Sequence, residues 1–236
     1  MKRGEKMIQQ QCDNLNEVAN LLELRTFAYD VLRKVFITEP SKELIAQFQN
    51  GIMNYFPFAE ENHLLKEGMA DVQHYFETFN LEEDFNRLHW DYTRMFIGPF
   101  RLPVPIWESA YLNKDGLLFQ EETLKVRRIY LENNLISVNH RSEADDHLGL
   151  ELDFMYQLSY LAEDLLKDRN MGQLQKTIND QKYFLTEHLL KWTPLFGNKV
   201  AAHGETEFYK GMAKVLNGFL AIDKICLEEL LNTLRQ

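Results

Sequence analysis

The chain has 236 residues, which is enough for one large domain or two small ones, and its 45% hydrophobic and 12% aromatic content can form a substantial core. The formal net charge of −10 disfavours a nucleic-acid partner and favours a basic one. The two cysteines, Cys12 and Cys226, lie at opposite ends, which argues against a disulfide scaffold or a cysteine metal site and fits a reducing compartment.

No stretch approaches the ~20 apolar residues of a membrane-spanning helix, and the first residues contain no apolar run typical of a secretory signal. We therefore expect a soluble, cytoplasmic protein without stable membrane insertion.

Apolar residues recur at helical spacing along most of the chain, with no alternating β pattern, internal repeat or low-complexity linker. We expect residues 1–12 to be a flexible end and residues 13–236 to form a single all-α domain of about nine to eleven helices. The longer helices are predicted over residues 13–37, 41–50, 59–79, 81–97, 121–133, 145–168, 173–192 and 205–234. Helix starts are expected at the caps Asp13 or Asn14, Ser41, Asn80 and Asp145 or Asp146, and Pro194 is expected to end a helix.

One segment, residues 98–109, interrupts the helical pattern. Gly98 ends the preceding helix, and three of the six prolines follow at positions 99, 103 and 105. Each proline fixes its own φ and pushes the residue before it out of the helical region, so the segment is predicted to be stiff and extended. It is either a structural strut or one wall of a groove, and its aromatic residues Phe100 and Trp107 either line that groove or fill the core.

Several polar side chains invite a chemical interpretation. Asp145 and Asp146 are expected as acidic caps at a helix start. His147 and Glu151 share a helix face and, with His140, could supply zinc ligands, although a His–Glu hydrogen bond at the core edge is the commoner arrangement.

The sequence contains neither a P-loop nor a Gly-x-Ser-x-Gly elbow. His188 and Trp192 lie one turn apart and are expected to pack together in the core. The residues thus predict no enzyme, no cofactor and no metal, but a binding protein for a partner that is basic and partly apolar.

Three ordered motifs resemble those of the TorD/DmsD family, the redox-enzyme maturation chaperones of molybdoenzymes. The first is the run Met95 to Tyr111, which contains Gly-Pro, further prolines and Trp-Glu-Ser. The second, Glu143 to Gly149, resembles the family's Pro-x-Asp-His run but lacks its proline. The third is Phe-x-x-x-His-Leu-x-x-Trp, found here as Phe184, His188, Leu189 and Trp192.

The resemblance implies an all-helical chaperone, monomeric or domain-swapped, that binds the twin-arginine signal peptide of a molybdopterin-dependent oxidoreductase. Such a chaperone assists cofactor insertion and folding before export. By this resemblance Asp145 and Asp146 would pair with the arginines, and aromatic residues would take the apolar part of the peptide. The predicted peptide site is Phe96, Phe100, Pro103, Pro105, Trp107, Glu108, Ser109, Asp145, Asp146 and His147. The alternative is a helical enzyme or metal carrier that uses His147, Glu151 and His188.

Overall fold

The structure is a computed structural model that describes residues 2–98, 102–113, 121–136 and 143–235, with side chains described from residue 14 onward. The described part is helical and contains no strand, which confirms the predicted all-α class. It has ten α-helices: α1 (Lys2–Phe36), α2 (Lys42–Gln49), α3 (His63–Glu77), α4 (Leu81–Tyr92), α5 (Ser109–Leu112), α6 (Glu121–Glu132), α7 (Leu148–Lys167), α8 (Met171–Phe184), α9 (Leu190–His203) and α10 (Glu207–Thr233). A 3₁₀ turn (Ile52–Tyr55) and two π-helical turns (Thr93–Ile97 and Leu185–Leu189) complete the order.

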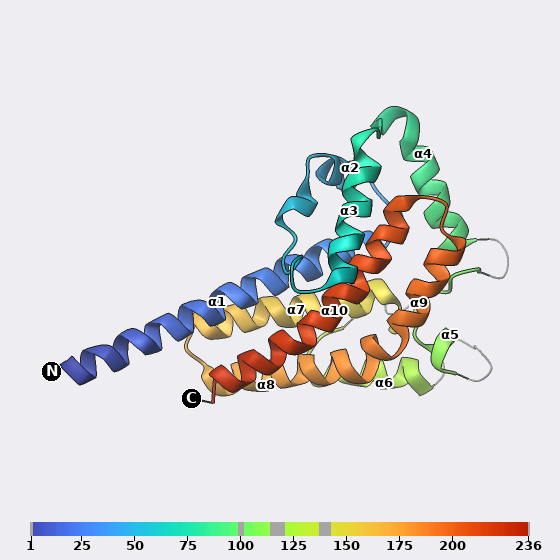
Figure 1. Ribbon diagram of the computed structural model, residues 1–236. Coiled ribbons are helices and arrows are strands. Elements are labelled where there is room, and N and C mark those ends of the chain that lie inside the picture. Colours follow the sequence, from blue (N-terminus) through green and yellow to red (C-terminus); the bar gives the residue numbers. More distant parts are fainter. Residues whose placement is uncertain (1, 99–101, 114–120, 137–142, 236) are drawn as a thin grey trace.

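The long helices form an elongated body around one apolar core. α1 and α7 run side by side, α10 crosses in front of them, and α8 lies along the lower edge (Figure 1). α2, α3 and α4 lie at the top of the view, and α5 and α6 at the lower right. A single buried apolar cluster reaches from Phe48 of α2 through Phe219 of α10 to Val126 of α6.

α3 and α10 pack closely, and glycines face each other at their contact. A Cβ on Gly211 would lie 2.9 Å from the Gly68 carbonyl oxygen, and one on Gly218 would lie 2.5 Å from the Leu65 amide nitrogen. These glycines let the two backbones approach more closely than any larger residue would allow.

Helix starts follow the sequence at some positions and depart from it at others. Ser41 and Asn80 cap α2 and α4, as predicted, by accepting hydrogen bonds from backbone amides. The first helix begins at Lys2 instead of at the predicted cap Asp13 or Asn14.

The prediction that α7 begins at Asp145 or Asp146 is wrong. The helix begins at Leu148, and His147 is its N-cap, with its ring Nδ1 accepting from the Gly149 amide at 3.1 Å. The two aspartates lie in the preceding turn because their carboxylates bind other elements, as described below.

Pro194 was also expected to end a helix, and it does not. It lies inside α9, directly after the π-helical turn Leu185–Leu189. The chain changes direction between α8 and α9 at this turn (Figure 1), which matches the usual association of sharp bends with prolines and π-turns.

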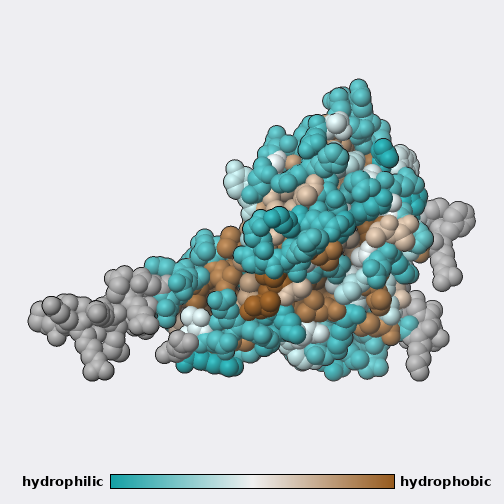
Figure 2. Space-filling view, in the orientation of Figure 1, coloured by the Kyte–Doolittle hydropathy of each residue, from teal (hydrophilic) through white to brown (hydrophobic). Residues whose placement is uncertain are grey.

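The face seen in Figure 2 is mostly hydrophilic, with apolar side chains gathered over α10, where Ile225 is exposed. Within the described ranges, no helix is long and apolar enough to cross a bilayer.

Candidate functional site

The described part of the proline-rich segment outside helices, residues 102–107, has the extended form that its sequence predicts. Side chains alternate along it: Val104 and Ile106 are buried in the core, whereas Pro103, Pro105 and Trp107 are half-exposed on the other side. This alternation is what a strand-like backbone produces. The inner residues of the segment therefore anchor it in the core, as expected of a structural strut. Its outer residues remain available to form one wall of a groove.

The first two motifs are brought together by a short antiparallel contact. Trp107 and His147 form an isolated β-bridge. It is flanked by hydrogen bonds from the Glu108 amide to the Asp146 carbonyl (3.0 Å) and from the Leu148 amide to the Ile106 carbonyl (2.9 Å). The extended segment is thus fixed against the turn that leads into α7.

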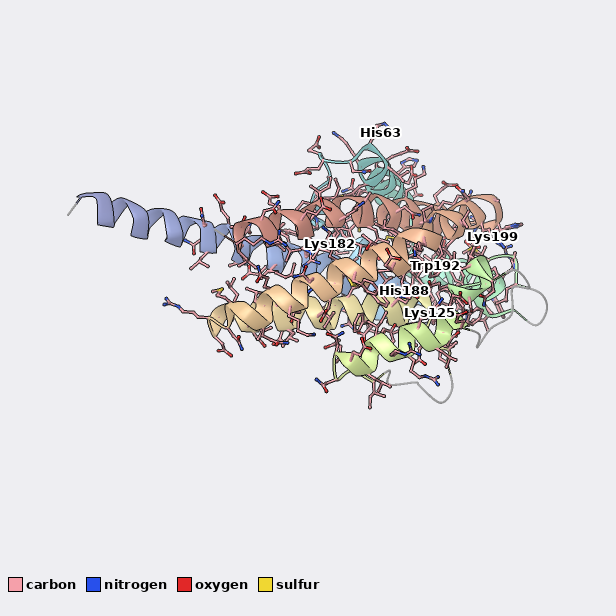
Figure 3. The ribbon with its side chains drawn as sticks, turned by 90° about the horizontal axis from the view of Figure 1, so that it is seen from below. His63, Lys125, Lys182, His188, Trp192 and Lys199 are labelled. Atoms are coloured by element: carbon pink, nitrogen blue, oxygen red, sulfur yellow. The ribbon has the colours of Figure 1, made fainter. Side chains whose placement is uncertain are left out.

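The third motif lies directly beneath this contact. The Nδ1 atom of His188 lies 2.9 and 3.1 Å from the two carboxylate oxygens of Glu108, and the pair is buried. The Nε1 atom of Trp192 donates to Glu151 at 3.1 Å. Figure 3 shows His188 and Trp192 inside the molecule, with Lys125 on the neighbouring α6 and His63 at a distant edge of the view.

One acidic side chain of this buried cluster, Glu151, favours its neutral form. Burial, followed by the charges of Glu108 and Asp146, raises the pKa of Glu151 well above its ordinary value, which favours the neutral form of this carboxyl group. This arrangement removes one negative charge from a region where two carboxylates would otherwise repel each other.

Asp146 and His147 have structural partners on the inner side. Asp146 is fully buried, and its carboxylate accepts from the Ser109 amide (2.9 Å) and from the Thr123 hydroxyl (2.8 Å). Burial lowers the pKa of His147, which matches a neutral ring whose Nδ1 accepts the capping hydrogen bond.

The outer side of the cluster carries acidic groups beside an aromatic ring. Glu143 accepts from the Trp107 indole at 2.7 Å. Asp145 forms an ion pair with Arg127 of α6, at 2.6 Å between Nε and Oδ2, and the backbone carbonyl of Asp145 accepts from the Tyr130 hydroxyl at 3.0 Å. Tyr130 therefore connects Asp145 to the cavity that its own side chain helps to line.

Below the ring of Tyr130 lies an open cavity of about 160 Å³. Its lining is mostly apolar and comes from the end of α6 and the first turns of α7: Tyr130, Leu135, Ile136, Leu150, Asp153, Phe154 and Gln157. A cavity of roughly 150 Å³ lined by apolar side chains holds one benzene, so this one has room for a single leucine or phenylalanine side chain.

The ten residues predicted for the peptide site differ in their exposure to solvent. Pro103, Pro105 and Trp107 are half-exposed at the surface, and Phe100 lies outside the described residues. Asp145 is 2% exposed and lies beneath Arg127. The others are buried: Phe96 in the aromatic core, and Glu108, Ser109, Asp146 and His147 in the polar cluster.

Three residues at this surface were not singled out from the sequence as part of the predicted site: Glu143, Arg127 and Tyr130. Glu143 could have been found from its place next to Asp145. Arg127 and Tyr130 lie on a charge-rich helix whose partner cannot be deduced from its spacing alone.

The donors named for a metal site have other partners. His188 faces Glu108, Glu151 faces Trp192 and Glu108, and His147 caps α7. His140 lies outside the described residues. Among the residues that the structure describes, no group of three or more His, Cys, Asp or Glu side chains is placed to hold a metal ion.

Comparison with known proteins agrees with the motifs. Residues 59–198 match the family model described as nitrate reductase delta subunit. The chain is 26% identical over 223 residues to the chaperone protein TorD of Vibrio cholerae, which covers 92% of this chain and 98% of the relative. It is 28% identical over 212 residues to the TorD of Vibrio vulnificus strain YJ016, with 89% and 97% covered.

A second kind of relative has a different name. The chain is 27% identical over 191 residues to the Tat proofreading chaperone DmsD of Salmonella typhimurium, with 81% of this chain and 84% of the relative covered. The family match contains all three motifs that meet around the Trp107–His147 bridge. The chain therefore belongs to the nitrate reductase delta subunit family, among the TorD and DmsD redox-enzyme maturation chaperones.

Proposed function

We propose that this protein is a cytoplasmic chaperone that binds the twin-arginine signal peptide of a molybdopterin-dependent oxidoreductase. It would hold the precursor while the cofactor is inserted, before export. The observation that carries the proposal is the meeting of the three motifs around one contact: the Glu143 carboxylate accepts from Trp107, and Asp145 is joined through its backbone carbonyl to Tyr130, which lines the cavity.

The chemistry of this surface suits such a peptide. A twin-arginine peptide is basic at one end and apolar beyond it. Guanidinium groups bind carboxylates through charge-assisted hydrogen bonds, and an aromatic ring next to them offers a cation–π contact. The cavity takes one apolar side chain, and the net charge of −10 attracts the basic end.

The inner polar cluster has a separate role in this proposal. Glu108, His188, Glu151 and Trp192 hold the extended segment against α7 and α9. Because these groups are buried and paired, they position the outer residues and do not contact the peptide.

Calorimetric titration tests the proposal. The wild-type protein should bind a twin-arginine leader peptide with a Kd of order micromolar, about −8 kcal/mol, and should bind a Lys-Lys version clearly more weakly. Asp145→Asn should reduce this preference for arginine. Equal binding of the two peptides, or no binding of either, would contradict the proposal.

A further inference from the structure

We propose that Arg127 occupies, as an internal ligand, the guanidinium position of the peptide site, and that a peptide arginine must replace it on Asp145. This inference rests on the proposed function. It concerns one contact, the ion pair between Arg127 Nε and Asp145 Oδ2 at 2.6 Å.

The exposure of the two partners is the first argument. The side chain of Asp145 is 2% exposed, whereas that of Arg127 is 42% exposed. Because only the Arg127 side chain of this pair reaches solvent, a guanidinium from outside would take the place that Arg127 now fills. The carboxylate lies in a low-dielectric environment, so it needs a cation in that place at all times.

A comparison with other Arg–Asp pairs is the second argument. Arg33 is held by Asp30 and Asp153 and stacks over the ring of Tyr156 at 4.1 Å, so it is fixed from several sides. The buried Asp91 pairs with Arg94 but also accepts from the amides of residues 205 and 206.

Asp145 differs from both cases. Among the described residues, Arg127 is the residue that donates a hydrogen bond to the Asp145 carboxylate. Exchange of one guanidinium for another leaves the buried charge compensated throughout, and a lysine ammonium lacks the planar fork of donors with which a guanidinium binds a carboxylate. The pair therefore also favours arginine over lysine.

The test compares Arg127→Ala with Arg128→Ala. The two variants remove the same charge from adjacent positions of α6, but only the first frees Asp145. Arg127→Ala should bind the twin-arginine peptide roughly tenfold more tightly than the wild type, and Arg128→Ala should stay within about twofold. Weaker or unchanged binding by Arg127→Ala, while the wild type binds the peptide, would overturn the inference.

A second measurement needs no peptide. Arg127→Ala leaves the Asp145 carboxylate unpaired, so millimolar N-methylguanidinium should raise its melting temperature, and methylammonium should raise it less. The wild-type protein, whose site is filled, should respond to neither. Equal responses of the wild type and the variant would overturn the inference even if the peptide titration fails. A wild-type protein that does not distinguish arginine from lysine peptides contradicts instead the proposed function.

Discussion

Glu151 illustrates how one buried carboxyl group makes stability depend on pH. Its pKa is raised by burial, then by Glu108 and Asp146, so the folded state keeps a proton that the unfolded chain releases above a pKa of about 4.3. Folding therefore binds a proton in this window, and the stability from Glu151 falls as the pH rises toward the folded-state pKa.

Glu151→Gln tests this account. The glutamine amide is a permanent donor toward Glu108, and its oxygen can still accept from Trp192. The variant should lose less stability than the wild type between pH 5 and pH 8, as followed by thermal melts. His147 titrates in both proteins, so the difference isolates Glu151. An identical pH slope in both proteins would contradict a protonated Glu151.

A substitution of Asp146 tests whether this buried carboxylate stabilises the fold and does not bind the peptide. It accepts two hydrogen bonds, from the Ser109 amide and the Thr123 hydroxyl. In Asp146→Asn, the new amide NH₂ group faces either the Ser109 amide or the Thr123 hydroxyl, and one of these two hydrogen bonds is lost. The free energy of unfolding should therefore drop by about 1–3 kcal/mol. Urea unfolding measures this loss. The preference for arginine peptides should persist in the folded variant. Wild-type stability with a lost arginine preference would instead make Asp146 a peptide ligand.

At the scale of the elements, the contact of α3 with α10 depends on glycine. A Cβ at Gly218 would lie 2.5 Å from the Leu65 backbone. Gly218→Ala should therefore cost about 1–3 kcal/mol of unfolding free energy through overpacking.

The matched control is Gly172→Ala in α8, where an added Cβ meets nothing within 4 Å. The control should be neutral or gain up to about 1 kcal/mol, since alanine favours helix. Denaturant unfolding of the two variants gives both values. Equal effects at the two positions would rule out close packing as the reason for Gly218.

The helix pattern was largely predictable from apolar spacing and caps, and the non-helical form of residues 102–107 was predictable from the prolines of this segment. The start of α7 was not, because Asp146 satisfies the Ser109 amide and Thr123 of another helix, which sequence spacing does not reveal. The place of Pro194 inside α9 depends on a π-helical turn that has no clear sequence signal.

The same limit holds at the scale of the whole molecule. Arg25 of α1 is fully buried and pairs with Asp223 of α10 at 2.5 Å, across 198 positions of the chain. Gln181 of α8 accepts from the same guanidinium. These partners could not be matched from the sequence because each residue looks like part of an ordinary charged helix face. The contact joins three long helices around the core.

Arg25→Met leaves the buried Asp223 carboxylate without its cation, with the Tyr29 hydroxyl as a remaining hydrogen-bond donor. The free energy of unfolding should fall by about 3–5 kcal/mol, and the double variant Arg25→Met/Asp223→Leu should recover part of that loss. Urea unfolding of Arg25→Met, Asp223→Leu and the double variant checks this. A double variant that loses as much as the two single changes added together would mean that the helices need the charges themselves.

The location of the peptide site is the central claim, and photo-crosslinking tests it most directly. A twin-arginine peptide with photo-leucine in its apolar part is bound to the wild-type protein, irradiated and mapped by mass spectrometry. We expect crosslinks at the cavity residues Tyr130, Leu150 and Phe154, and a much lower yield with the Lys-Lys peptide. Crosslinks gathered instead over α10, where Figure 2 shows apolar side chains, would contradict the account.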